Sequence, residues 1–573
     1  MSNNGAHSLL PGPPALLPMT SPGANSKLPS AQVPNVGLFS TLSGNSLGLM
    51  AGFEGMSLAP GLSPPQGFPG SAGSAMFPGL NGATLPAHLQ FQSVELVDSD
   101  DFNSHASLRV SLVPHALQRD ESTGSYLTKG ALISHRGADD VLVRCWRKSS
   151  ASIVDAVLLR NEIKALRVLS RKCAHVAKIL HLGAVDLSSQ PAGGPAPSVS
   201  DLVGIVTETS DLGTLDRFTV NHLQMLAQNP PAPSAVSPSS AGAVPPVVGY
   251  STSDLQSMCV QLIEGLIQCH EMNIRHRDIR PQNILVSPCT DKYQSRQFAR
   301  GLQLKYANFT PVALLPLCTA SENPLLSVDL DKWVAPEVDA DTRKHGVRFQ
   351  ASSDVWSLGL TIYYLATGGQ LPFDSFKQAC DAAANPDYRR ACLEKHNLQE
   401  RAPMLYDLIE RLVRPAYMRT DLQIIRCHPF LWTMDCRKNM LTSFANASMM
   451  RGSDVIANFV TGIDKISPLY VFGADGWVAL MAPYLLNLVQ AKVKTDFWWS
   501  GTYLLQAIKH QLQFPETLMQ SVYPRMTVHQ ATHAYLRQIT EVDFPRLLIL
   551  LYELGGIHGK WLWDGDEIVH TWN

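Results

Sequence analysis

The pattern of apolar and polar positions divides the chain into three parts. Over residues 1–90, frequent prolines and glycines interrupt every apolar period, and only two side chains carry charge. After this segment, short apolar runs such as 141–144 and 202–207 predict strands, and an apolar period over 153–170 predicts a helix between them. Beyond Ser253 the spacing of apolar residues is mostly helical. The pattern therefore predicts a smaller β-rich part followed by a larger helical part.

Three segments rich in proline, glycine and serine are predicted to add nothing to a core. Residues 1–90 are predicted to be disordered, because the entropy lost on ordering them would not be offset by apolar burial. Two inserts, at about 188–200 and 229–249, are predicted to be surface loops, because a packed element tolerates few prolines.

Composition and charge argue against several classes of protein. The formal net charge is -2 and 16% of the residues are charged, so no basic field points to nucleic-acid binding. The ten cysteines form neither a Cys-x-x-Cys pair nor a Cys/His ligand spacing, which predicts buried thiols in a reducing compartment. The uncharged run 476–491 is shorter than the ~20 residues that a membrane span needs, and Pro483 interrupts it. With no signal peptide evident, the chain is predicted to be soluble and cytoplasmic.

Four motifs follow one another in the central part of the chain. Residues 276–285 read His-Arg-Asp-Ile-Arg-Pro-Gln-Asn-Ile-Leu, 335–337 read Ala-Pro-Glu, 353–359 read Ser-Asp-Val-Trp-Ser-Leu-Gly, and Arg419 stands farther on. Their order and spacing resemble the protein-kinase family, from its catalytic loop to the Arg that pairs with the Glu of Ala-Pro-Glu.

This resemblance implies an α+β, bilobal protein-kinase fold and roles for three residues of the catalytic loop. Asp278 would orient an attacking hydroxyl, and Asn283 would hold a magnesium ion. Arg280 stands where serine/threonine kinases usually carry Lys. The implied domain covers 91–434, with an N-lobe of about 91–213 and a C-lobe of about 214–434.

The positions that handle nucleotide depart from the kinase pattern. The best counterpart of the Gly-rich loop, 127–133, keeps only Gly130, and the side chains around it would obstruct backbone N–H groups from approaching phosphates. Arg144 replaces the strand Lys, and its planar fork is no substitute for a compact ammonium. Asp-Phe-Gly becomes Asn308-Phe-Thr, whose amide is a weaker magnesium ligand than a carboxylate. The nucleotide-site residues implied by the resemblance are Gly130, Leu142, Arg144, Glu162, Thr207, Glu208, Leu285 and Asn308, with Asn283 and Asn308 as a weak magnesium site.

Positions with structural roles, in contrast, match the family. The structural positions match the family whereas the positions that handle nucleotide do not, and this contrast predicts a pseudokinase that acts as a scaffold. An active serine/threonine kinase with unconventional nucleotide contacts is the alternative, because Asp278, Asn283 and Glu162 are present. ATP and magnesium are the candidate cofactors, and the altered positions argue against both. The matching structural positions are His276, Phe309, Leu166, Asp354, Glu337 and Arg419.

About 140 residues follow the run His428-Pro-Phe-Leu-Trp432, and their apolar spacing predicts helices. They resemble the kinase-extension nuclease domain of the inositol-requiring ER-stress sensor and of ribonuclease L, which implies an all-α domain over 435–573. The matching pieces are Asp475-Gly-Trp477, a helix around 480–489, Tyr503-Leu-Leu-Gln-Ala-Ile-Lys-His510 and Phe544-Pro-Arg-Leu-Leu548.

The resemblance to that family also implies a platform that forms homodimers or heterodimers, an endoribonuclease activity and a link to the unfolded-protein response. The family's Arg-Asn nuclease pair aligns with Lys509 and His510, but its downstream His aligns with Phe514. His510 is a candidate general base, or alternatively a solvent-facing or capping residue of a helix. An endoribonuclease or RNA-binding protein is therefore the third hypothesis for function.

Two further patterns have both a functional and a structural interpretation. Phe497, Trp498 and Trp499 lie beside Lys492 and Lys494, so they are candidates for base stacking, although consecutive aromatic residues more often anchor a helix to a core.

His529 and His533 are four residues apart, as in the zinc motif His-Glu-x-x-His. Gln530 replaces the Glu of that motif, and the sequence suggests no third ligand. We therefore interpret the pair as a chance helical spacing.

Overall fold

Residues 1–87 and the two predicted inserts lie outside the described residues, and the predicted boundary at residue 90 falls inside the first strand. The computed structural model describes residues 88–92, 108–112, 118–120, 125–134, 137–147, 163, 165–186, 202–228, 250–289, 301–309, 313–314, 332–338, 350–449, 454–490 and 497–557.

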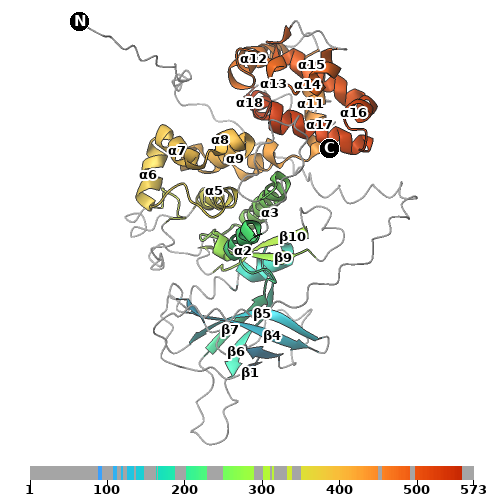
Figure 1. Ribbon diagram of the computed structural model, residues 1–573. Coiled ribbons are helices and arrows are strands. Elements are labelled where there is room, and N and C mark those ends of the chain that lie inside the picture. Colours follow the sequence, from blue (N-terminus) through green and yellow to red (C-terminus); the bar gives the residue numbers. More distant parts are fainter. Residues whose placement is uncertain are drawn as a thin grey trace, which may run out of the picture. The chain divides into compact units, whose positions relative to one another are not determined.

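The β-rich part is a seven-stranded antiparallel sheet with the strand order β2-β1-β6-β7-β5-β4-β3 (Figure 1). Strand β2 also pairs with β4, so six of these strands close into a ring. The predicted strands 141–144 and 202–207 are confirmed within β5 and β7, and residues 165–170 of the predicted helix are helical, with the helix continuing to residue 172. The strands are β1 (His88–Gln92), β2 (Leu108–Leu112), β3 (Gln118–Asp120), β4 (Ser125–Ser134), β5 (Gly137–Arg147), β6 (Ile179–Asp186) and β7 (Leu202–Glu208).

The segment 127–133, predicted as the counterpart of a phosphate-binding loop, is instead part of strand β4. Gly130 lies opposite Val141 of β5 on one side and opposite Leu112 of β2 on the other. Pairing with two neighbouring strands commits the backbone N–H and C=O groups of this segment to the sheet. The segment that the sequence offers as the counterpart of the Gly-rich loop is therefore a paired strand, which could not be foreseen because local sequence does not identify its partner β2.

The helical part of the kinase-like region is built around α3 (Thr252–Glu271) and α5 (Ala351–Thr367). Helix α5 is buried on nearly all sides, which explains why its sequence is apolar all round rather than on one stripe. Its close approach to the C-terminal end of α9 requires Gly359, because a Cβ there would lie 2.8 Å from both Leu412 Cβ and Val413 Cγ1.

Shorter elements complete this region and precede the extension. They are α2 (Leu215–Gln228), β8 (Ile274–Arg275), η1 (Pro281–Asn283), β9 (Ile284–Pro288), β10 (Leu302–Tyr306), β11 (Ala313–Leu314), α6 (Phe376–Ala384), α7 (Pro386–Leu393), η4 (Glu394–His396), α8 (Leu398–Arg401), α9 (Pro403–Leu412), η5 (Ala416–Met418), α10 (Leu422–Ile425) and η6 (Pro429–Leu431).

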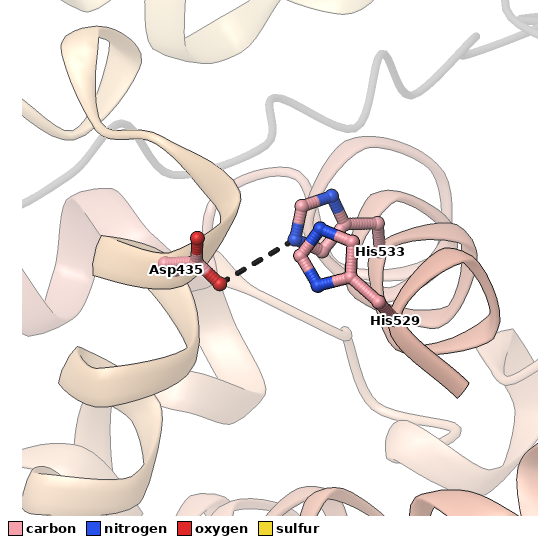
Figure 2. Close-up of side chains that lie close together, drawn as sticks. All are labelled: Asp435, His529 and His533. Atoms are coloured by element: carbon pink, nitrogen blue, oxygen red, sulfur yellow. Dashed lines mark hydrogen bonds and ion pairs between the residues drawn. The ribbon is translucent and has the colours of Figure 1, made fainter. Parts of the chain in front are cut away.

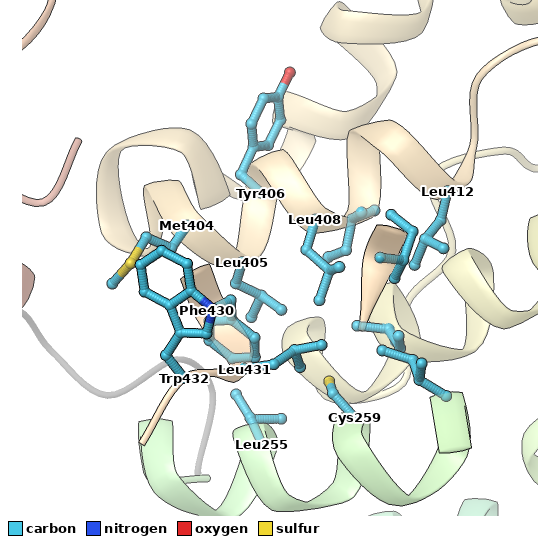
Figure 3. Packing of buried hydrophobic residues seen from close by; sticks show 14 of the residues in the cluster. Leu255, Cys259, Met404, Leu405, Tyr406, Leu408, Leu412, Phe430, Leu431 and Trp432 are labelled. Atoms are coloured by element: carbon cyan, nitrogen blue, oxygen red, sulfur yellow. The ribbon is translucent and has the colours of Figure 1, made fainter. Parts of the chain in front are cut away.

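The kinase-like region ends in the run His428–Trp432, which packs against α3 and α9 (Figure 3). Phe430, Leu431 and Trp432 are buried beside Leu255 of α3. Two hydrogen bonds fix the last residue of the run: Trp432 Nε1 donates to Cys427 O at 2.9 Å, and Gln256 Nε2 donates to Trp432 O at 2.6 Å. The chain therefore enters the extension from a rigid position on the C-lobe.

A buried polar network joins this run to the last described helix, α18 (Leu547–Ile557). Asp407 of α9 accepts hydrogen bonds from His428 Nε2 at 2.9 Å and from Arg411 Nε at 2.8 Å. Arg411 also pairs with Glu553 of α18, and its guanidinium carbon lies 5.3 Å from the centre of the Tyr552 ring. The kinase-like region and the extension therefore contact each other through charged and aromatic side chains.

The pKa values of Asp407 and His428 in this network both lie below their usual ranges. Burial raises the pKa of Asp407, but the hydrogen bond and charge of His428 and the charge of Arg411 outweigh it and hold that pKa at about 2. Burial lowers the pKa of His428 despite its contact with Asp407. At neutral pH the imidazole therefore donates as a neutral ring and Arg411 supplies the positive charge, whereas the charge of His428 acts on Asp407 only at the acid pH where this carboxylate itself titrates.

The extension is helical over its described residues, as predicted. The helix expected around 480–489 is α14, which begins at Pro483, and the short helix α13 precedes it. In order, the elements are α11 (Met434–Ala447), α12 (Asp454–Tyr470), α13 (Trp477–Leu480), α14 (Pro483–Gln490), α15 (Gly501–Gln513), α16 (Pro515–Ser521), α17 (Val528–Arg537), the π-helical η8 (Gln538–Asp543) and α18.

A fully buried arginine ties the first helix of the extension to its C-terminal part. Arg437 of α11 is 0% exposed, and its Nη1 donates to Thr540 Oγ1 at 3.0 Å and to Glu541 Oε1 at 2.8 Å. Both acceptors belong to η8, where the wider π turn follows directly on α17.

Candidate nucleotide and metal site

Asp354 of α5 holds the start of the catalytic loop in place through hydrogen bonds to its backbone. Its carboxylate accepts backbone N–H groups of His276 at 2.9 Å and Arg277 at 2.8 Å, and it accepts His270 Nε2 at 2.9 Å. Burial raises the pKa of Asp354, but the hydrogen bond and charge of His270, with the charge of His276, lower it below its usual value. This clamp stabilises Arg277 at a φ of 67°, a left-handed conformation that non-glycine residues rarely adopt.

The loop presents Asp278, the residue aligned with the catalytic base, within a set of close polar contacts. Asn283 Nδ2 donates to the Asp278 backbone oxygen at 2.9 Å and to its Oδ2 at 2.7 Å. Arg280 Nε lies 2.9 Å from the other carboxylate oxygen, Oδ1, as an ion pair. Burial raises the pKa of Asp278 above its usual value, although Arg280 opposes the shift. Both carboxylate oxygens therefore have a partner within the loop.

Asn308 completes this cluster as a hydrogen-bond donor. Its Nδ2 donates to Asn283 Oδ1 at 3.0 Å. The orientation of the Asn283 amide follows from its network, because its nitrogen faces two oxygens of Asp278 that can only accept. Its oxygen must then face residue 308, which has to present an N–H group. An aspartate at position 308 could not make this bond.

These four side chains contact one another in series, from Arg280 through Asp278 and Asn283 to Asn308, and the arrangement does not fit a magnesium ion. The Asp278 charge is balanced by Arg280, and the Asn283 oxygen that would coordinate a metal already accepts the Asn308 amide. Magnesium favours several oxygen ligands in near-octahedral geometry and is bound through one or two carboxylates. Here an amide N–H occupies the place where a cation would bridge two acceptors.

The structural positions predicted from the kinase motifs are confirmed. Arg419 Nη1 lies 2.7 Å from Glu337 Oε1 and Arg419 Nη2 lies 3.2 Å from Oε2, the bidentate pair expected between these motifs. The buried ring of Phe309 packs 4.5 Å from that of His276, whose Nε2 donates to Ala307 O at 3.0 Å. Leu166 is also buried.

The N-lobe candidates are brought together in part. Across β5 and β7, Leu142 lies opposite Thr207 and Arg144 opposite Ile205. Leu285 of β9 is buried and lies opposite Lys305 in the β9–β10 pair. Glu162 and Thr310 lie outside the described residues.

Glu208, predicted as a nucleotide contact, has a different partner. Lys305 Nζ donates to both carboxylate oxygens of Glu208, at 2.8 and 2.9 Å, and the Lys178 backbone N–H donates to Oε1 at 2.8 Å. The side chain of Glu208 therefore links β7 to β10. No sequence signal points to Lys305, because its partner lies 97 positions away.

The nuclease-like candidates lie near the end of helix α15. His510 is in its last turn, with its ring centre 5.0 Å from that of Phe514, and Lys509 precedes it. Phe514 thus occupies the side of His510 where the resemblance implies a second histidine. Phe497 stacks on Tyr503 at 4.3 Å, as expected of a core anchor, whereas Trp498 and Trp499 are 41% and 46% exposed.

One pair interpreted as chance does have a third potential ligand. The carboxylate of Asp435, on α11, lies beside His529 and His533 of α17. The sequence suggested no third ligand, because α11 and α17 are distant in sequence and only the fold brings them together.

Residues 239–431 match the family model of the protein kinase domain. The chain is similar to the serine/threonine-protein kinase/endoribonuclease IRE1a of Arabidopsis thaliana, with 23% identity over 54% of the chain and 34% of the relative. It is similar to the "sensor for unfolded proteins in the ER" ire1 of Schizosaccharomyces pombe, with 29% identity over 53% of the chain and 29% of the relative.

The chain thus spans about a third of the length of these relatives. A solved structure of the Rad53 kinase domain and SCD2 covers 53% of the chain and 87% of that structure, with 18% identity and a TM-score of 0.34, a likeness too distant to support an inference. Within the described ranges, no helix has the length and apolar character needed to cross a bilayer.

Proposed function

We propose that this chain is a pseudokinase of the IRE1 type that works as a signalling scaffold, without magnesium-dependent phosphotransfer. The observation that carries the proposal is the hydrogen bond from Asn308 Nδ2 to Asn283 Oδ1 at 3.0 Å. It places a donor where phosphotransfer requires a metal ligand. The catalytic loop keeps its shape without a cation, because the amide completes the hydrogen bonding of the cluster.

The junction supports a role in transmitting conformation to the extension. Asp407, Arg411 and Glu553 connect α9 to α18, and Trp432 is held by Gln256 of α3. A change in the position of the C-lobe would therefore be transmitted to the extension through packed and charged contacts rather than through a loose linker. We infer that the two regions act as one body, and that dimerisation or partner binding is their output.

Phosphotransfer assays on the full chain test the proposal. We expect no transfer from ATP to a generic acceptor or to the chain itself with magnesium or manganese, and no difference between the unchanged chain and Asp278→Ala. Transfer that requires a divalent metal and is lost in Asp278→Ala would instead establish an active kinase.

The relatives are named kinase/endoribonucleases, so cleavage of a stem-loop RNA is measured in the same preparations. We expect none, because Phe514 stands where a second proton-transferring histidine would be needed beside His510. Cleavage that is lost in His510→Ala and kept in Asp278→Ala would assign the function to the extension instead.

A further inference from the structure

Three side chains with metal-binding chemistry meet at the outer edge of the contact between α11 and α17. His529 and His533 come from successive turns of α17, and Asp435 comes from the first turn of α11 (Figure 2). The two imidazole rings lie with their centres 4.0 Å apart. One ligand atom from each of the three residues lies within 4.8 Å of the other two.

These distances are close to those that one shared ion would impose. Zinc binds nitrogen and oxygen ligands at roughly 2.0–2.2 Å in tetrahedral geometry, which puts two ligand atoms about 3.4 Å apart. His533 Nε2 and Asp435 Oδ1 are already 3.5 Å apart. Asp435 and His529 are exposed, so their side chains have room to rotate toward His533 and close the remaining gap.

We propose that Asp435, His529 and His533 form a binding site for a divalent transition-metal ion of the zinc class. Two nitrogen donors favour zinc and its neighbours over magnesium and calcium, which prefer oxygen. Two histidines four residues apart are how a helix supplies two ligands to one zinc ion. The carboxylate from a second helix adds the third donor, and the Asp435 side chain is 69% exposed, so the fourth position opens to water.

The site binds a metal rather than performing hydrolysis. In the zinc-hydrolase spacing the residue after the first histidine is a Glu that serves as base. Here that residue is Gln530, and its Oε1 accepts the Thr527 backbone N–H at 3.0 Å in a capping box at the start of α17. A neutral amide engaged in capping cannot remove a proton from a metal-bound water.

The ion would clamp two helices that an internal contact already joins. Arg437, two residues after Asp435, reaches Thr540 and Glu541 just beyond the end of α17. Metal binding at the outer edge would add a second attachment between the same elements. Because α11 is the first helix after Trp432, the clamp would stabilise the extension next to its junction with the kinase-like region.

The experiment measures the Zn²⁺ affinity of the full chain by competition with a chromophoric chelator, and the absorption spectrum of bound Co²⁺. The test variant is His529→Asn/His533→Asn, and Asp435→Asn is measured separately. The control is His510→Asn/Asp454→Asn, which removes one histidine and one aspartate from the extension away from the cluster. Circular dichroism of all variants without metal checks that the fold is kept.

We expect the unchanged chain and the control to bind one Zn²⁺ with the same affinity, and the test variants to bind it roughly tenfold or more weakly. His529→Cys keeps a zinc ligand, so this variant should bind Zn²⁺ nearly normally. We also expect Zn²⁺, and not Mg²⁺, to raise the unfolding temperature of the unchanged chain but not that of the double variant. Equal Zn²⁺ affinity in the unchanged chain and both test variants, or binding of Mg²⁺ in preference to Zn²⁺, would overturn the proposal.

Discussion

Replacing Asn308 by aspartate tests whether its amide does the work of a cation. In Asn308→Asp the donor to Asn283 Oδ1 is lost, and a carboxylate oxygen faces that acceptor instead. The Asn283 amide cannot turn round to compensate, because its nitrogen donates to Asp278 at 2.9 and 2.7 Å. The substitution therefore leaves two acceptors in contact and adds a second negative charge near Asp278.

The cost follows from the burial of these groups. Leaving a buried polar group without its partner costs about 1–3 kcal/mol. For a domain of 150–250 residues, each kcal/mol lowers the unfolding temperature by about 2–4 °C. We therefore expect Asn308→Asp to unfold roughly 2 to 12 °C below the unchanged chain in the absence of metal. With magnesium and ATP the new carboxylate becomes a hard-cation ligand, and much of the loss should be recovered.

Differential scanning calorimetry with and without magnesium and ATP measures both effects. Asn397→Asp is the matched control, because Asn397 has a φ of 53°, close to the 61° of Asn308, but is exposed and outside the cluster. The control should differ little from the unchanged chain and should not respond to magnesium. An Asn308→Asp chain that is as stable as the unchanged one without metal would refute the role given to the amide.

Three further changes test the packing and the junction. The pKa of Asp407 is about 2 against an ordinary 3.8, so its ionised form adds about 2 kcal/mol of stability above pH 3.8. This stability is lost as the pH falls through 2. In urea unfolding, the stability difference between the unchanged chain and Asp407→Asn should therefore be larger at pH 7 than at pH 3. Gly359→Ala should cost about 1–3 kcal/mol, because its Cβ would lie 2.8 Å from Leu412 Cβ; an unchanged urea midpoint would contradict the contact. Arg437→Met should cost about 3 kcal/mol by leaving Glu541 unpaired, and adding Glu541→Leu should restore most of it; equal stability of the single and double variants would argue against the pairing.

The parts of the fold that could be predicted are those encoded by short motifs. The spacing of Ala335-Pro-Glu337 and Arg419 predicted an ion pair across 82 positions, because both motifs have one role in the kinase fold. Apolar periods predicted the helices, and Pro483 explains why the one expected around 480–489 begins where it does. In these cases the signal is local or is carried by a known pairing of motifs.

The features that could not be predicted depend on contacts between distant residues with no motif. Strand β2 pairs with β4 at Gly130, so the segment 127–133, which the sequence aligns with a Gly-rich loop, is a paired strand. Asp435 meets His529 and His533 only because α11 and α17 pack together. The loss of the metal carboxylate at Asn308 was visible in the sequence, but its hydrogen bond to Asn283 depends on an orientation that only the folded loop defines.

Thermal unfolding of the unchanged chain with ATP, in the presence and absence of magnesium, tests the central claim most directly. A ligand at ~100 times its dissociation constant adds about 2.7 kcal/mol to the folded state, which is readily measured. We predict that magnesium makes no difference to the unfolding temperature at any ATP concentration, because the Asn308 amide fills the position of the ion. A rise in unfolding temperature that requires ATP and magnesium together would contradict the account and restore the interpretation as a working kinase.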